Sequence, residues 1–135
     1  MTTSDPDRSA IMRAVKSENT KPEGIVRRLL HKLGYRYRLH RKDLPGKPDL
    51  TFAGRRRVIF VHGCFWHGHD CKRGARIPKQ NRDYWEKKII RNRHRDIMNV
   101  DALQQLSWKA LVVWECELGN SAALRDKLVS YLDGD

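Results

Sequence analysis

The chain has 135 residues, of which 28 are Lys or Arg and 16 are Asp or Glu, so its formal net charge is +12. This length predicts one domain over residues 1–135, because two halves would each be too small to bury a core. The positive excess indicates a polyanionic partner, either nucleic acid or an acidic membrane surface. No apolar run approaches the ~18 residues of a transmembrane span. The N-terminus lacks the apolar core of a signal peptide, so an intracellular, nucleic-acid-binding protein is predicted.

The N-terminal part of the sequence predicts a basic arm and a capped helix. Residues 1–19 form the arm, in which 9–17 have a thin apolar face and fit either a short helix or a mobile segment. A helix is predicted over 20–34, where apolar residues repeat at helical spacing. Thr20 and Glu23 have the spacing of a capping box, which accounts for Glu23 without a catalytic role.

Three strands are expected next. Residues 35–40 alternate apolar and cationic side chains, as a half-exposed strand does. A turn-rich loop over 41–48 leads into a short strand at 49–53. Residues 58–62 are apolar enough for a buried central strand.

The second half of the chain predicts a long basic helix over 81–106, a buried strand over 109–118 and a helix over 121–132 with Ser121 as its cap. The order is therefore helix, three strands, helix, strand, helix. This order indicates an α/β sandwich with a short mixed sheet.

The three cysteines indicate a zinc site. An odd count without an export signal argues against a disulfide framework. Cys64 and Cys71 flank a histidine-rich loop, and Cys116 lies at the end of a distant strand, so a closed set of thiolates and one imidazole is available. The alternative is that Cys116 is an ordinary buried thiol. The fourth ligand could be His62, His67 or His69. Of these, His69 is best placed, because it lies between the two loop cysteines in the sequence.

Asp49 is a candidate magnesium ligand. It follows Pro48 and begins a strand, and a hairpin would bring it beside Val61 and His62 at the end of the next strand. Many nucleases place a Pro-Asp on one strand and an acid on the next, so that carboxylates hold magnesium against phosphate. Here the second acid is missing, and a turn aspartate is the commoner explanation of the pair.

Two adjacent loop aromatics, Phe65 and Trp66, fit two interpretations equally. They pack beneath the loop or, in a chain of this charge, wedge between DNA bases. Trp85 either assists them or belongs to the core. From its position on the basic helix alone, Asp96 is interpreted as a solvated charge paired with neighbouring arginines.

Taken together, these motifs resemble the very-short-patch mismatch-repair (VSR-type) DNA endonucleases of bacteria. The matching stretches run in order over nearly the whole chain: IMRAV, PGKPDLTF, VIFVHGCFWHGHDC, NRDYWEKKI, N-x-x-R-D at 92–96, and LSWKALVVWECEL.

The resemblance implies a restriction-endonuclease-like fold, a three-layer α/β/α arrangement with a short mixed sheet and a structural zinc site. It also implies a magnesium-dependent enzyme that nicks double-stranded DNA 5′ of the thymine in T:G mismatches left by deamination of 5-methylcytosine. Such a protein is expected to be a monomer of the bacterial cytoplasm, bound at times to the nucleoid and to repair proteins, with no membrane association. Two other functions stay open: a zinc-stapled DNA-binding protein without catalysis, and a nuclease of the same fold for restriction or phage defence.

The resemblance also assigns roles to residues. Asp49 matches the magnesium-binding catalytic aspartate, with the backbone carbonyl of Val61 as a second ligand where the best-known members carry threonine. His67 matches the histidine that activates water, supported by His62, Glu23 and Asp96. The implied zinc ligands are Cys64, His69, Cys71 and Cys116. The implied DNA contacts, including two in the N-terminal arm, are Phe65, Trp66, Trp85, Met12, Arg13, Lys47 and Asn92.

Overall fold

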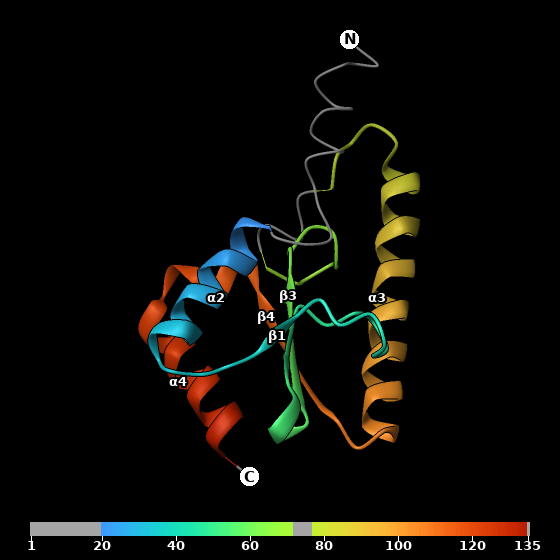
Figure 1. Cartoon of the computed structure of the whole chain (residues 1–135). Helices are drawn as coiled ribbons and strands as arrows, with labels where there is room; N and C mark the ends of the chain where they lie inside the picture. The colour runs from blue at the N-terminus through green and yellow to red at the C-terminus, as the bar shows by residue number, and fades with distance from the viewer. Residues whose placement is uncertain (1–19, 72–76, 135) are drawn as a thin grey trace.

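The computed structural model describes residues 20–71 and 77–134, and Figure 1 shows their arrangement. The arm over 1–19, with the predicted DNA contacts Met12 and Arg13, lies outside the described residues. The helices are α2 (Lys21–Lys32), α3 (Arg82–Gln105) and α4 (Ser121–Asp133), with two 3₁₀ turns, η1 (Ala53–Arg55) and η2 (Glu115–Gly119). The strands are β1 (Arg38–Leu39), β2 (Leu50–Phe52), β3 (Arg57–His62) and β4 (Lys109–Trp114).

The four strands form one mixed sheet in the order β1-β2-β3-β4, which confirms the predicted short mixed sheet. β1, β2 and β3 are antiparallel neighbours, whereas β3 and β4 run parallel. Because β3 and β4 are parallel and in register, His62 and Trp114 lie opposite each other where both strands end. The loop after β3 and the η2 turn after β4 therefore leave the sheet at the same edge.

Helices cover both faces of this sheet, with α2 and α4 on one side and α3 on the other (Figure 1). Side chains of β3 contribute to the hydrophobic core on each face of the sheet, because successive side chains of a strand point to opposite faces. Ile59 packs with Val26 of α2 and Leu128 of α4. Val58 and Phe60 pack with residues of the other cluster, which include Leu103 of α3. Within the described ranges, no helix has the length and apolar character needed to cross a membrane.

Three predicted boundaries were wrong. The first strand is shorter than 35–40 and ends before His40, whose φ of 50° is left-handed. β4 ends at Trp114 instead of 118, because the Trp114 N–H donates to the Glu117 carboxylate and the chain turns into η2. Asn120, and not Ser121, caps α4, since its Oδ1 accepts from the Ala123 N–H at 3.1 Å.

Candidate active site and metal cluster

A cleft of about 970 Å³ opens at the sheet edge where β3 ends. It is lined by residues from the α2 N-terminus, the loop before β2, the end of β3, the loop that follows β3, α3 and the start of η2. The polar and charged residues on its wall include His40, Lys47, Asp49, His62, His67, Arg95, Asp96, Asn99 and Glu115.

Asp49 lies beside Val61, as the predicted hairpin requires. Its Oδ2 accepts the Val61 backbone N–H at 2.7 Å, and the side chain is nearly buried. Burial is the main cause that raises the pKa of Asp49 from 3.8 to about 7; the Val61 N–H opposes this shift, and the Glu23 carboxylate adds to it. A carboxylate oxygen of Asp49 and one of Glu23 lie within 4.8 Å of each other. Two carboxylates this close repel each other unless a proton or a cation lies between them.

Glu23 has a second role beside its place in the helix N-terminus. Its N–H donates to Thr20 Oγ1 at 3.3 Å, which confirms Thr20 as the cap of α2. Its carboxylate, however, is 1% exposed and lies 2.8 Å from His40 Nε2 and 3.5 Å from Arg27. Helix capping therefore does not account for Glu23 completely.

His40 is the site residue that sequence reasoning missed. The alternation over 35–40 placed it on the outward face with the arginines. Its left-handed backbone, which is uncommon for a residue other than glycine, instead turns the imidazole toward Glu23. The His40 N–H also donates to the Asp49 carbonyl at 3.1 Å, so the two residues are held together through the backbone. The available signal was a lone histidine ending a strand whose other outward residues are arginines.

A second polar group faces the same cleft. His67 Nδ1 lies 2.6 Å from Asp96 Oδ2, so Asp96 pairs with a histidine and not with a neighbouring arginine as its sequence position alone suggested. His62 stacks on His67 with ring centroids 3.7 Å apart and planes 4° apart. Burial, followed by the nearby His67 charge, lowers the pKa of His62 to about 3, so this imidazole is neutral near pH 7.

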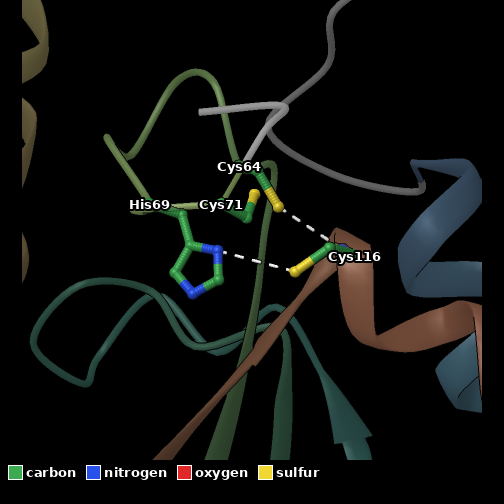
Figure 2. Close-up of side chains that lie close together, drawn as sticks. All are labelled: Cys64, His69, Cys71 and Cys116. Atoms are coloured by element: carbon green, nitrogen blue, oxygen red, sulfur yellow. Dashed lines mark hydrogen bonds between the residues drawn. The ribbon is translucent and has the colours of Figure 1, made fainter. Parts of the chain in front are cut away.

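The cysteines and one histidine form a compact cluster, drawn in Figure 2. One ligand atom from each of Cys64, His69, Cys71 and Cys116 lies within 4.8 Å of the others. The Cys116 N–H donates to Cys64 Sγ at 3.3 Å, and Cys116 Sγ lies 3.5 Å from His69 Nδ1. His69 is thus the loop imidazole that joins the cysteines, while His62 and His67 belong to the group around Asp96.

Without a metal this cluster favours protonated thiols. Burial raises the pKa of Cys64 to about 12, and burial also raises the pKa of Cys116. Three thiols and one imidazole within reach of one point match the donor set of a tetrahedral structural zinc site. A cation there would take the place of the thiol protons.

The loop aromatics pack around Trp85 without being fully buried. Phe65 and Trp66 are half-buried, and each ring centroid lies 5.7 Å from that of Trp85. Trp85 itself is 6% exposed and contacts both rings. The Lys88 ammonium lies 5.6 Å from the Trp66 ring. The arrangement leaves two supported rings and a positive charge beside the cleft.

Comparison with known proteins places this arrangement in a family. Residues 2–73 match the family described as "DNA mismatch endonuclease Vsr", which is just over half of the chain. The chain belongs to the Vsr family. The protein is therefore a DNA endonuclease, as the resemblance of its motifs predicted.

Relatives over nearly the full length carry related names. The chain is 54% identical to "Type II nicking enzyme V.XorIIP" of Xanthomonas oryzae pv. oryzae, over 93% of this chain and 92% of the relative. It is 47% identical to "Type II nicking enzyme V.NmeAIP" of Neisseria meningitidis, over 90% and 86%. It is 38% identical to "DNA mismatch endonuclease Vsr" of Escherichia coli, over 91% and 78%.

Two further predicted DNA contacts, Lys47 and Asn92, lie in different parts of this Vsr-family structure. Lys47 is exposed on the cleft wall with a left-handed φ of 50°. The Asn92 amide donates to the Trp66 carbonyl at 2.8 Å, so Asn92 fastens the aromatic loop to α3. A DNA contact by either side chain stays a prediction.

Gly68 fixes how closely the loop of this Vsr-family site approaches α3. It has a φ of +64°, and an added Cβ would lie 2.5 Å from Ile89 Cγ2 and 2.7 Å from Arg93 Cδ. We expect Gly68→Ala to lower the free energy of unfolding by about 1–3 kcal/mol, from backbone strain and overpacking. Denaturant unfolding measures this effect. Gly54→Ala is the matched control because a Cβ there meets nothing within 4 Å. Equal midpoints for the two variants would contradict the close approach.

Proposed function

We propose that the protein is a magnesium-dependent, strand-specific endonuclease that nicks 5′ of the thymine in T:G mismatches arising from deamination of 5-methylcytosine. The observation that carries this proposal is that one cleft brings Asp49, the His67–Asp96 pair and the Phe65–Trp66 pair together. Family membership and the mismatch endonuclease among the relatives support it. The fold is proposed to be restriction-endonuclease-like. A single monomeric domain would bind duplex DNA with the arm over 1–19.

Two ion sites belong to this proposal. Asp49 and the Val61 backbone carbonyl would hold magnesium, with Glu23 close by; a carbonyl ligand makes the side chain at position 61 immaterial. The crowded, buried carboxylates fit a hard divalent cation. Bound magnesium polarises the phosphate and stabilises charge on its oxygens. Cys64, His69, Cys71 and Cys116 would hold structural zinc.

His67 is proposed as the base that takes a proton from the attacking water. Asp96 accepts a hydrogen bond from His67 Nδ1–H, which leaves Nε2 of the neutral ring as the proton acceptor. The neutral His62 ring covers one face of His67 without adding charge. General-base catalysis of this kind contributes typically ~100- to 10,000-fold to a rate.

Phe65 and Trp66 are proposed to sense the mismatch by inserting into the base stack, with buried Trp85 as their support. A mismatched pair costs less to unstack than a matched pair, by a few kcal/mol at most. Because phosphate contacts are blind to base pairing, ring insertion provides the discrimination.

Replacing both Phe65 and Trp66 with alanine tests this role. We expect the ratio of affinities for T:G and matched duplexes to fall by at least about tenfold, while affinity for matched DNA changes little. Parallel binding titrations on the two duplexes measure the ratio. Tyr84→Ala is the control, because Tyr84 of α3 is an aromatic residue next to Trp85 with 52% exposure. An unchanged ratio in the double variant would exclude the wedge.

A panel of duplexes separates the proposed function from its two rivals. The proposal predicts magnesium-dependent nicking of T:G duplexes and little cleavage of other mismatches or of matched DNA. A restriction or defence nuclease would cleave matched DNA, in keeping with the relatives named type II nicking enzymes. A zinc-stapled binding protein would bind the duplexes and cleave none of them. Either of the last two results would replace the proposed function.

A further inference from the structure

Trp114 contacts both the Cys/His cluster and the histidine pair of the proposed catalytic site. It is the last residue of β4, paired in register with His62, the last residue of β3. The His69 ring stacks on the indole, with centroids 4.1 Å apart and planes 16° apart. The His62 ring contacts the same indole edge-on, with centroids 5.3 Å apart and planes at 74°.

This contact continues as far as the proposed base. His62 stacks on His67 at 3.7 Å, and the His67 centroid lies 6.4 Å from that of Trp114. An unbroken series of ring contacts therefore runs from His69 of the cluster through Trp114 and His62 to His67.

The backbone of Trp114 is anchored at the end of β4, whereas the ring of His62 depends on its neighbours. The Trp114 backbone N–H donates to Glu117 Oε1 at 2.8 Å, and the Lys127 ammonium lies 2.7 Å from Oε2 of the same carboxylate. The buried His62 Nδ1, in contrast, has no hydrogen-bond partner among the described residues and lies 4.0 Å from Asp96 Oδ2. Packing against the rings of Phe60, His67 and Trp114 therefore sets the orientation of His62.

We propose that Trp114 is a positioning residue for the nicking reaction, which holds the stacked His62–His67 pair against the rigid Cys/His cluster. The inference rests on the proposed function, because it assigns the base role to His67. Its physical basis is that a fixed aromatic wall restricts ring rotation in the histidine pair. A misplacement of ~1 Å in a reacting group can cost about 100-fold in rate.

The first test compares Trp114→Leu and Trp114→Phe with the control Trp108→Leu. Trp108 is a buried tryptophan immediately before the start of β4 and is not among the residues that line the cleft. We expect Trp114→Leu to keep its zinc and its affinity for a T:G duplex, while the single-turnover nicking rate falls about 10- to 100-fold. Trp114→Phe restores most of the rate, because it restores a flat ring. Trp108→Leu loses stability but keeps the rate.

The second test measures the contact between the His62 and His67 rings in the absence of substrate. Inter-ring nuclear Overhauser effects between His62 and His67 are expected in the wild-type protein and in Trp114→Phe, and are expected to be lost in Trp114→Leu. This measurement also separates failure of the positioning role from failure of the proposed function. If the wild type nicks no T:G duplex, the proposed function is wrong, and the ring contacts still test the positioning role. Retained contacts in Trp114→Leu, or a nicking rate equal to that of Trp108→Leu, would overturn the inference. Loss of zinc from Trp114→Leu would also overturn it, by reducing Trp114 to a support of the cluster.

Discussion

Replacing Asp49 with asparagine is expected to abolish nicking and, at the same time, to stabilise the fold. Asparagine keeps the shape and an acceptor for the Val61 N–H but removes the anion that would bind magnesium. We expect the nicking rate to fall by at least about 1,000-fold, which corresponds to several kcal/mol of lost transition-state stabilisation. Affinity for T:G duplexes stays the same or rises, because a carboxylate near phosphate repels it when no metal is bound.

The gain in stability follows from the direction of the pKa shift. Burial raises the pKa of Asp49 from 3.8 to about 7, so the folded protein binds this proton more tightly than the unfolded chain does. Between about pH 4 and pH 7 the stability of the protein without magnesium therefore falls as pH rises, as the unfolded state releases the proton first. The Asp49→Asn variant does not lose stability in this way. Above neutral pH its free energy of unfolding is expected to exceed that of the wild type by about 1–3 kcal/mol.

Denaturant unfolding of zinc-loaded protein without magnesium, on both sides of neutral pH, measures this effect. Asp43→Asn is the control, because Asp43 lies in the same loop, is exposed and is paired with Arg41, which lowers its pKa. An Asp49→Asn protein that is less stable than wild type at high pH would contradict the buried charge. Wild-type nicking by that variant would remove Asp49 from the catalytic account.

Removing a ligand of the Cys/His cluster is expected to have the largest effect on stability. Cys116→Ser or His69→Ala should lose the zinc and lower the free energy of unfolding by at least ~3 kcal/mol, because metal binding to a closed site contributes directly to folding. Nicking falls as well, since the loop over 63–71 that carries Phe65, Trp66 and His67 loses its attachment to η2.

Elemental analysis and thermal unfolding test this expectation together. His94→Ala serves as the matched control, because His94 is an exposed histidine of α3 outside the cluster. Pure wild-type protein without zinc, or Cys116→Ser with wild-type thermal stability, would contradict the structural site.

The sequence predicted those parts of the site that depend on spacing along a regular element. Two strands joined by a tight turn pair in only a few registers, so a hairpin was enough to place Asp49 beside Val61. Cys116 was grouped with the loop cysteines on residue type and cysteine count, and the structure confirms the grouping, since β3 and β4 are parallel and end at one edge of the sheet.

What the sequence did not predict depends on local backbone geometry and on contacts between distant elements. The left-handed φ of His40 reverses the face that its alternation indicated, and no neighbouring glycine marks the change. The pairing of Asp96 with His67 was implied by the family resemblance but not by the position of Asp96 on its helix, because it depends on how α3 lies across the end of β3. The end of β4 depends on a hydrogen bond that the Glu117 carboxylate accepts from the Trp114 backbone N–H, and strand propensity does not predict such a bond.

Mapping the cut on a T:G duplex labelled on each strand in turn, with magnesium present, tests the proposed mismatch and strand specificity. We expect a single nick on the thymine strand, immediately 5′ of the mismatched T, with the guanine strand intact and the matched duplex uncut. Cleavage of both strands, or equal nicking of the matched duplex, would contradict it.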